Sequence, residues 1–445
     1  MKYSTANWHI HADSSLEFGK TKVALLDKSL VLLVGTGKAK KLNTFRLRKL
    51  AHKAIDFLKQ HVPEKSGKVV SHNFKDFTNL SEEELNLLLQ EPNYEFDKYK
   101  KIKHPKADLS GLTKSKKSSE EFTILNSINL IKDLVNEPPN IATPKFLADT
   151  CLALGKKLKN IKVKTKNRAE CQKLGLTAFL AVAQGSDLEP YMIEMEYMAV
   201  KKNQPTIGLI GKGLTYDTGG LSLKPNKYMY GMKSDMAGAA TVIGVMKAIA
   251  EMKLPVNVKA LILACENGFG DNSYRPGDVV KAYNGKTIEI VDTDAEGRIT
   301  LADALAYLSE DKSVETIIDF ATLTGSCAVT FGDAASGAFT NDKNLLAKYQ
   351  QAGDKTGEPI WELPMDEEMK EDLKSSIADM SQCAGRPDAS LAALLLKEFI
   401  QGEQKWLHLD IAGTGYLDEA TDYFPCGATG RGVWSTIEFL KNTCK

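Results

Sequence analysis

Residues 211–235 constrain the fold of this chain more than any other stretch. They read GKGLTYDTGGLSLKPNKYMYGMKSD and place the charged side chains of Lys212, Asp217, Lys224 and Asp235 on a glycine-rich segment that we expect to be irregular. The apolar run before it, residues 206–210, is typical of a strand, and residues 236–250 have the spacing of a buried helix. Open α/β sheets bind their ligands on loops at the carboxyl ends of strands. The stretch therefore predicts charged side chains gathered at one edge of an α/β sheet.

A second charged segment, VDTDAEGR, occupies residues 291–298 and again stands between a strand-like run and a helix pattern. It carries Asp292, Asp294, Glu296 and Arg298. Two loops of this kind can meet at one rim of one sheet, and four or five carboxylates there would repel unless cations lay between them. Oxygen-rich sites suit hard or borderline divalent ions, and a shared set of carboxylates suits two of them.

Strand-like runs recur along the second part of the chain, with helical patterns between several of them. They cover residues 176–184, 191–197, 206–210, 256–265, 288–291, 316–320 and 406–411. This alternation predicts an α/β fold with a mixed, mostly parallel sheet flanked by helices. A chain of 445 residues is too long for one ordinary core. We expect a smaller α/β N-terminal domain with a basic linker over residues 1–118, and a catalytic domain over residues 119–445.

Composition excludes several classes of function. The net charge of +1 gives no general reason to expect a nucleic-acid partner. Seven scattered cysteines without a CxxC pair fit reduced thiols, so we expect a cytoplasmic protein. No signal-like segment and no run of 18 apolar residues is present, so no membrane partner is expected. Only His408 lies beyond residue 104, which weakens a histidine-based zinc site or a Ser-His-Asp triad.

Taken singly, each charged residue has an ordinary explanation as a turn residue, a helix cap or a surface charge. The joint pattern favours a two-metal hydrolytic site. An ammonium group cannot bind a metal, but a lysine beside two dications can lose its proton, and Lys212 at the end of an apolar strand is the better candidate. Lys224 would stay charged and polarise a carbonyl or hold an oxyanion, and Arg298 would hold an anion beside the metals. A two-metal phosphoesterase uses similar acidic sites and is the alternative.

Several longer segments carry a resemblance to a known family. GKGLTYDTGGLSLKP, MKSDMAGAATVIG and TDAEGRITLADAL resemble signature segments of the leucyl aminopeptidase (cytosol aminopeptidase) family. The resemblance continues through DLVNEPPNIATP, FLAVAQGSD, RPGDVV, FATLTGSC, HLDIAGT and ATGRGV and covers about residues 120–440. It implies a metal-dependent aminopeptidase that releases N-terminal residues, with leucine-like side chains preferred, from peptides.

The resemblance also implies roles for individual residues. Lys212, Asp217, Asp235 and Glu296 match the tight metal position, and Asp217, Asp294 and Glu296 match the more exchangeable one. Lys224 matches the catalytic lysine, and Arg298 the arginine that holds a bicarbonate ion for proton transfer. Met232, Thr322 and Gly325 match positions that line the first substrate pocket. The implied cofactors are two zinc or manganese ions per subunit with bicarbonate at Arg298, and the implied assembly is a homohexamer.

Two departures of the sequence from the family pattern lie near these residues, and a third, ENGFG at residues 266–270, alters a loop and not a ligand. Asp292 stands where the family usually has asparagine, and CAGRPDAS at residues 383–390 lacks some glycines common near the substrate pocket. The second departure leaves the side-chain preference open. Some relatives also bind DNA, and the basic residues 38–53 and the lysine-rich linker keep an additional DNA-binding role as an alternative. Nucleic acid is nevertheless not the expected partner.

Overall fold

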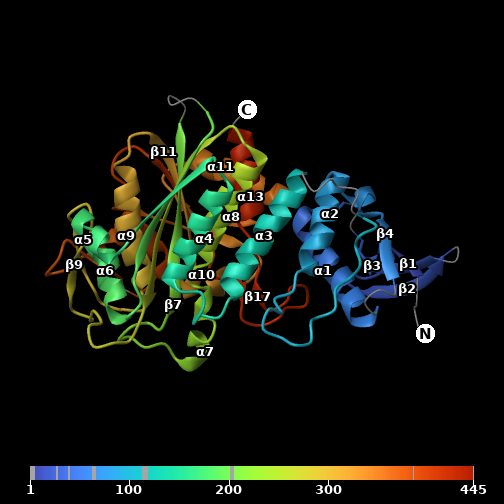
Figure 1. The fold of residues 1–445 in the computed structure, drawn as a ribbon, viewed down its shortest axis with the longest axis horizontal. Helices are drawn as coiled ribbons and strands as arrows, with labels where there is room; N and C mark the ends of the chain where they lie inside the picture. Colours follow the sequence, from blue (N-terminus) through green and yellow to red (C-terminus); the bar gives the residue numbers. More distant parts are fainter. Residues whose placement is uncertain are drawn as a thin grey trace. The chain divides into compact units, whose positions relative to one another are not determined.

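The computed structural model describes residues 6–26, 29–38, 41–62, 67–112, 119–200, 205–383 and 385–443, which form two compact units (Figure 1). The smaller unit comprises Met1–Asn129, Gly353–Glu358 and Glu419–Cys426, and the larger comprises Leu130–Ala352, Pro359–Asp418 and Gly427–Lys445. Residues 113–118 of the expected basic linker lie outside the described residues. The domain division expected between residues 118 and 119 stays a prediction.

The smaller unit is a four-stranded sheet in the order β2-β3-β1-β4, with helix α1 packed against the sheet and helix α2 packed against α1. Strand β1 pairs in parallel with β3 and β4, and β2 pairs antiparallel with β3. The Ser81 side chain and Glu84 form a capping box at the start of α2, as the serine followed by acids predicts. Its elements are β1 (Ala6–Asp13), β2 (Thr21–Leu26), β3 (Ser29–Gly35), α1 (Thr44–His61), β4 (Gly67–His72), η1 (Phe74–Phe77), α2 (Glu82–Gln90) and η2 (Glu91–Asn93).

An eight-stranded mixed sheet forms the centre of the larger unit and confirms the predicted fold class. In sheet order its strands are β13 (Ile360–Glu362), β12 (Ser336–Thr340), β15 (Lys405–Asp410), β11 (Val314–Ala321), β7 (Thr206–Asp217), β8 (Asn257–Asn267), β6 (Tyr191–Met198) and β5 (Ile161–Lys166). The four central strands, β15, β11, β7 and β8, run parallel. Their carboxyl ends therefore lie at one edge of the sheet, where such folds place ligand sites.

Two further sheets and the helices complete the larger unit. The short strands are β9 (Val279–Lys281), β10 (Thr287–Glu289), β14 (Met380–Ser381), β16 (Tyr416–Leu417) and β17 (Gly427–Ala428). The helices are α4 (Pro144–Lys157), α5 (Arg168–Leu174), α6 (Thr177–Val182), η3 (Ala183–Gly185), α7 (Asn226–Met229), η4 (Met232–Ser234), α8 (Ala237–Met252), α9 (Glu296–Ser309), α10 (Gly325–Phe331), η5 (Glu367–Leu373), α12 (Asp388–Lys397) and α13 (Val433–Thr443). Helices α3 (Glu120–Asn136) and α11 (Lys343–Thr356) each contain a division between the two units.

Helices α8 and α9 pack on opposite faces of β7 (Figure 1). A Cβ atom on Gly211 would lie 2.6 Å from the Ala239 Cα atom of α8, so this glycine permits close contact between strand and helix. Gly208, three residues earlier, faces Leu308 of α9. The alternation of side chains along β7 thus gives one face to each helix.

Strand β7 is longer than predicted, because it continues through Lys212 to Asp217 and pairs with β8 as far as Asn267. The prediction that Lys212 and Asp217 lie on an irregular segment was therefore wrong. The register shifts between Leu214 and Tyr216, which places one extra residue, Thr215, in β7. A bulge of this kind reverses the alternation of the residues beyond it. Lys212 and Asp217, an odd number of residues apart, consequently face the same side of the sheet.

Two strand predictions need correction. The apolar run at residues 176–184 forms α6 and η3, whose residues from Ala178 to Ala183 are buried on all sides. The run at residues 288–291 contributes β10, which belongs to the separate sheet β14-β10-β9 and not to the main sheet. Among the described residues, no helix is long and apolar enough to cross a membrane.

Candidate metal centre

Four carboxylates converge beyond the carboxyl ends of the central strands. Asp217 ends β7, Asp235 lies just before α8, and Asp294 and Glu296 lie at the start of α9. One oxygen each of Asp217, Asp294 and Glu296 lies within 4.8 Å of the others. Although the second loop follows a strand of another sheet, α9 packs on β7 and brings Glu296 to the same edge. The predicted meeting of the two loops is thus what the structure contains.

Two lysines lie among these carboxylates. The Nζ atom of Lys212 is 2.8 Å from Asp235 Oδ1 and 2.8 Å from Glu296 Oε1, and it donates to the Thr322 carbonyl at 3.0 Å. The Nζ atom of Lys224 is 2.8 Å from Asp217 Oδ2 and also pairs with Asp294. Each ammonium group therefore stands between two carboxylates that come from different loops.

The pKa shifts reflect the crowding of negative charge. Burial and the charge of Glu296 raise the pKa of Asp217 to about 7. Burial also raises the pKa of Asp235 well above its ordinary value, against the opposing charge of Lys212. Burial acts in the same direction on Glu296, but Lys212 and Lys224 outweigh it and lower the pKa of this carboxyl. The raised pKa values of Asp217 and Asp235 show that the two lysines do not fully offset the negative charge and burial of the cluster.

Burial tends to lower the pKa of both lysines, but the surrounding carboxylates reverse the effect and raise both pKa values above the ordinary range. The oxygens Asp235 Oδ2 and Glu296 Oε2 are buried without a hydrogen-bond partner among the described residues. Buried carboxylate oxygens that lack donors are costly unless a cation binds them. The donor set therefore fits a pair of divalent cations.

Two side chains that were not predicted as site residues, those of Asn267 and Thr293, hold the two loops together. The Asn267 amide donates to Asp217 Oδ1 at 2.8 Å and to the Thr293 carbonyl at 2.9 Å. The Thr293 hydroxyl in turn donates to the Gly219 carbonyl at 2.6 Å and accepts from the Ser222 amide at 2.8 Å. The position of Asn267 at the end of an apolar strand, beside β7, was the signal in the sequence that could have identified it.

Gly297 is required by the packing of Lys212. A Cβ atom at this position would lie 2.5 Å from the Lys212 Cε atom and 2.7 Å from its Nζ atom. Lys212 is only 4% exposed and its Nζ is held by three acceptors, so it has little freedom to move away. The glycine in TDAEGR therefore allows α9 to approach the lysine.

Arg298 lies two residues beyond Glu296 in α9 and is buried. Its Nη2 atom donates to Asp388 Oδ1 at 2.8 Å, and its Nη1 atom donates to the Gln382 carbonyl at 3.4 Å. Asp388 is the first residue of α12 and was not predicted as a site residue. The guanidinium expected to hold a free anion therefore has a carboxylate partner within the chain.

The three predicted substrate residues occupy different positions. Thr322 follows β11 directly, and its hydroxyl donates to Asp235 Oδ1 at 2.7 Å, which ties it to the cluster. Gly325 begins α10 and is exposed, with open space where a Cβ atom would lie. Met232 is half-buried in η4, three residues before Asp235. Their role in binding substrate stays a prediction.

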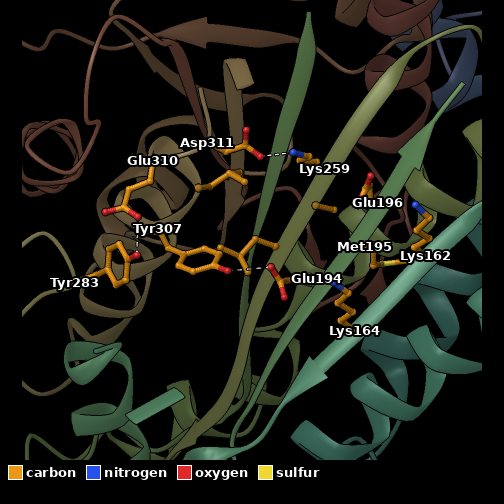
Figure 2. A pocket seen from close by; sticks show the side chains of 13 residues that line it. Lys162, Lys164, Glu194, Met195, Glu196, Lys259, Tyr283, Tyr307, Glu310 and Asp311 are labelled. Carbon is orange, nitrogen blue, oxygen red and sulfur yellow. Dashed lines mark hydrogen bonds and ion pairs between the residues drawn. The ribbon is translucent and has the colours of Figure 1, made fainter. Parts of the chain in front are cut away.

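A separate cavity of about 500 Å³ lies far from this cluster (Figure 2). Its lining includes Lys259, near the start of β8, whereas Asn267 at the cluster ends the same strand, about 26 Å away at the usual rise per residue. Figure 2 shows several of its polar groups paired with one another, as in Lys259 with Asp311 and the Tyr307 hydroxyl with Glu194. Among the described residues, Asp217, Asp294 and Glu296 are the group of three acidic side chains close enough to share a metal ion, so the acidic cluster is the better candidate site.

The comparisons with known proteins agree with this geometry. The model of the cytosol aminopeptidase family, catalytic domain, matches residues 129–437. A probable cytosol aminopeptidase of Fusobacterium nucleatum is 44% identical over 435 residues, covering 95% of this chain and 89% of the relative. One of Geobacter sulfurreducens is 40% identical over 428 residues, covering 93% and 85%. The structure of the bottromycin maturation enzyme BotP in complex with Mn superposes with a TM-score of 0.86 at 28% identity, covering 100% of both chains.

The family model matches more than half of the chain, and the Fusobacterium relative is 44% identical over most of both chains. Both matches favour peptide hydrolysis over phosphoester hydrolysis. This chain belongs to the cytosol aminopeptidase family and is a metal-dependent aminopeptidase.

Proposed function

We propose that this aminopeptidase removes N-terminal residues, with leucine-like side chains preferred, from peptides by means of two divalent ions. Lys212, Asp217, Asp235 and Glu296 hold one ion, and Asp217, Glu296 and Asp294 hold the other. Lys224 and Arg298 are the catalytic side chains. The observation that supports this most strongly is the close set of Asp217, Asp294 and Glu296 oxygens, with Lys212 and Lys224 beside them.

Lys212 changes its protonation state in this proposal. Its Nζ atom lies against Asp235, Glu296 and the Thr322 carbonyl, so the charged form is fully hydrogen-bonded. Two divalent ions would neutralise the carboxylates in place of the Lys212 ammonium group, and their positive charge would disfavour the ammonium form of Lys212. The neutral amine can then bind a metal through its lone pair and still donate to the Thr322 carbonyl.

When bound, two such ions lower the pKa of water and polarise a carbonyl group. Lys224 remains charged and, on leaving Asp294, can donate to the oxyanion that forms when the peptide carbonyl is attacked. The negative charge of the cluster favours a free N-terminal amine over an internal peptide group. The half-buried Met232 and the open space beside Gly325 suit an apolar first side chain.

Metal identity and assembly are further parts of the proposal. Zinc or manganese fits a mixed nitrogen and oxygen donor set, and the Mn-bound structure of BotP supports manganese. We further propose a cytoplasmic homohexamer. Elemental analysis of purified protein should find two ions per chain, and light scattering should give the mass of six 48.8 kDa chains.

The activity is tested with leucyl anilide and a panel of other aminoacyl anilides, on chelator-treated protein reloaded with zinc or manganese. N-acetyl-leucyl anilide, which lacks the free amine, and nitrophenyl phosphate should not be hydrolysed. Lys224→Ala should lower kcat about 10²–10³-fold, because it removes one preorganised oxyanion donor. Lys227→Ala, at an exposed position three residues away, is the matched control. Wild-type turnover in folded Lys224→Ala would overturn the assignment of Lys224.

A further inference from the structure

The ion pair between Arg298 and Asp388 places a carboxylate of the chain against the arginine that lies two residues beyond Glu296. Arg298 Nη2 and Asp388 Oδ1 are 2.8 Å apart, and the arginine side chain is 4% exposed. A buried guanidinium requires a negative partner, and a planar carboxylate is its preferred one. Asp388 comes from a different element, 90 residues along the chain, so the contact depends on the fold.

Asp388 is held on one side and open on the other. It is the first residue of α12, where the partial positive charge of a helix N-terminus stabilises a carboxylate. The Ser326 hydroxyl of α10 donates to its second oxygen, Oδ2, at 3.4 Å. Its side chain is nevertheless 32% exposed, unlike that of Arg298. The carboxylate therefore keeps lone pairs that a water molecule can reach.

Gln382, six residues before Asp388 in the sequence, is bonded to the loop that carries Asp294. The Gln382 Oε1 atom accepts from the Val291 and Asp292 amides at 3.1 Å each, and its Nε2 atom donates to the Ala295 carbonyl at 2.8 Å. The Cys383 thiol, whose pKa is raised by burial, lies within the electrostatic influence of Arg298, Asp292 and Asp388 alike. Gln382 is thus bonded to the loop that carries Asp294, and Asp388 contacts Arg298 in the helix that carries Glu296.

We infer that the Asp388 carboxylate is the anion of Arg298 in this enzyme, and that it replaces the free bicarbonate that the family resemblance implies there. The residues do not favour a free anion at the same nitrogen, since Asp388 Oδ1 accepts from Nη2 and a second anion there would be repelled by this carboxylate. This inference rests on the proposed function, because it assigns the proton transfer of peptide hydrolysis to a group of the chain.

The proton balance of hydrolysis is then complete without a free anion. Asp388 takes one proton from the attacking water as its oxygen bonds to the peptide carbonyl carbon, and becomes a carboxylic acid. It returns that proton to the peptide nitrogen as the carbon–nitrogen bond breaks. The products are the free amino acid and the shortened peptide, and Asp388 ends as the carboxylate. Arg298 holds the carboxylate in place throughout.

A competing arrangement uses the remaining nitrogen of Arg298. The Nε atom is buried without a hydrogen-bond partner among the described residues, so a free anion could bind there in addition to Asp388. In that case bicarbonate would raise the activity of the wild-type enzyme. The two arrangements therefore differ in the response of the unmodified protein to bicarbonate.

The test compares wild type, Asp388→Gly, Asp388→Asn and the control Asp372→Asn, an exposed acid of η5, in carbon dioxide-free buffer with and without bicarbonate. We expect wild type and Asp372→Asn to turn over at rates that bicarbonate does not change. Asp388→Gly, which leaves a space, should lose about 10²–10⁴-fold in kcat with little change in KM, and bicarbonate or formate should restore it. Asp388→Asn keeps the volume, so added anions should restore it poorly.

Calorimetric titration of bicarbonate gives a readout that is independent of catalysis. Asp388→Gly should bind the ion and wild type should not, while circular dichroism confirms that both are folded. Bicarbonate-dependent turnover in wild type, bicarbonate binding to wild type, or full activity of Asp388→Gly without an anion would each overturn the inference. Absence of peptide hydrolysis by metal-loaded wild type would instead refute the proposed function, and the calorimetry would still decide the role of Asp388.

Discussion

Replacing Asn267 with alanine should weaken metal binding although Asn267 is not a ligand. Its amide donates to Asp217 Oδ1 at 2.8 Å and to the Thr293 carbonyl at 2.9 Å, and the residue is fully buried. A hydrogen bond to a charged group contributes about 1.5–3 kcal/mol and one to a carbonyl about 1 kcal/mol. In the variant, Asp217 Oδ1 still accepts from the Gly219 amide, and the Thr293 carbonyl still accepts from the Tyr274 hydroxyl. We therefore expect a loss of about 2–3 kcal/mol in the free energy of unfolding.

The same change removes one of the two hydrogen-bond donors to Asp217 Oδ1. Loss of a group that orients a metal ligand typically lowers metal affinity about 10–100-fold. Metal affinity is measured by competition with a chromophoric chelator, and stability by urea unfolding of the chelator-treated protein. Asn267→Asp should be worse than alanine, because it places a second carboxylate 2.8 Å from Asp217 Oδ1.

The control is Asn160→Ala, which removes one amide hydrogen bond, to the Ala250 carbonyl at 2.9 Å, away from the acidic cluster. It should change stability by about 1 kcal/mol and leave metal affinity unaltered. The reasoning would be refuted if Asn267→Ala bound metal as tightly as wild type, or if Asn267→Asp bound it more tightly than Asn267→Ala.

Three further predictions concern packing, pH and metal loading. Gly297→Ala should lower the free energy of unfolding by about 1–3 kcal/mol, because the new Cβ would lie 2.5 Å from Lys212 Cε. Elemental analysis of this variant should find fewer than two ions per chain, and two tightly held ions would contradict the prediction. The pKa of His408 is lowered by burial but raised further by Asp319, and is net raised from 6.5. The stabilisation that protonated His408 provides is complete below pH 6.5 and is lost as pH rises through the folded-state pKa. In the presence of a chelator, the free energy of unfolding should therefore fall more steeply above pH 6.5 in wild type than in His408→Asn. Equal slopes for the two proteins would refute this. Divalent metal at a hundredfold excess over Kd should stabilise the stripped protein by about 2.7 kcal/mol in thermal unfolding, and an unchanged midpoint would exclude binding to the native state.

The sequence predicted the main sheet and the acidic cluster because their signals are local. Apolar runs identify strands such as β8 and β11, and the ligands Asp294 and Glu296 lie together in one short motif. The same local signals could not distinguish the short apolar run of α6 from a strand, since burial on all sides removes the periodicity of either. They could not assign β10 to its sheet either, because pairing depends on partners far along the chain.

The pairing of Arg298 with Asp388 was beyond the sequence for a similar reason. The two residues are 90 positions apart, and nothing in the segment CAGRPDAS indicates which basic group its aspartate will contact. Asn267 was missed because a buried asparagine at the end of a strand is ordinarily a structural residue. Contacts of this kind follow from the packing of several loops and not from the pattern of any one of them.

The extra residue in β7, Thr215, determines which face of the sheet Asp217 occupies and therefore whether this carboxylate can reach the metal centre. If Thr215 stayed in β7 and the ladder with β8 became regular, Asp217 would turn to the opposite face of the sheet from Lys212. Its carboxylate would then point away from Asp294 and Glu296 and be lost to the ions in a single step. Evolution can therefore vary the loops around this site by insertion and deletion, but a residue added to β7 between Lys212 and Asp217 must be taken up by a bulge, as Thr215 is.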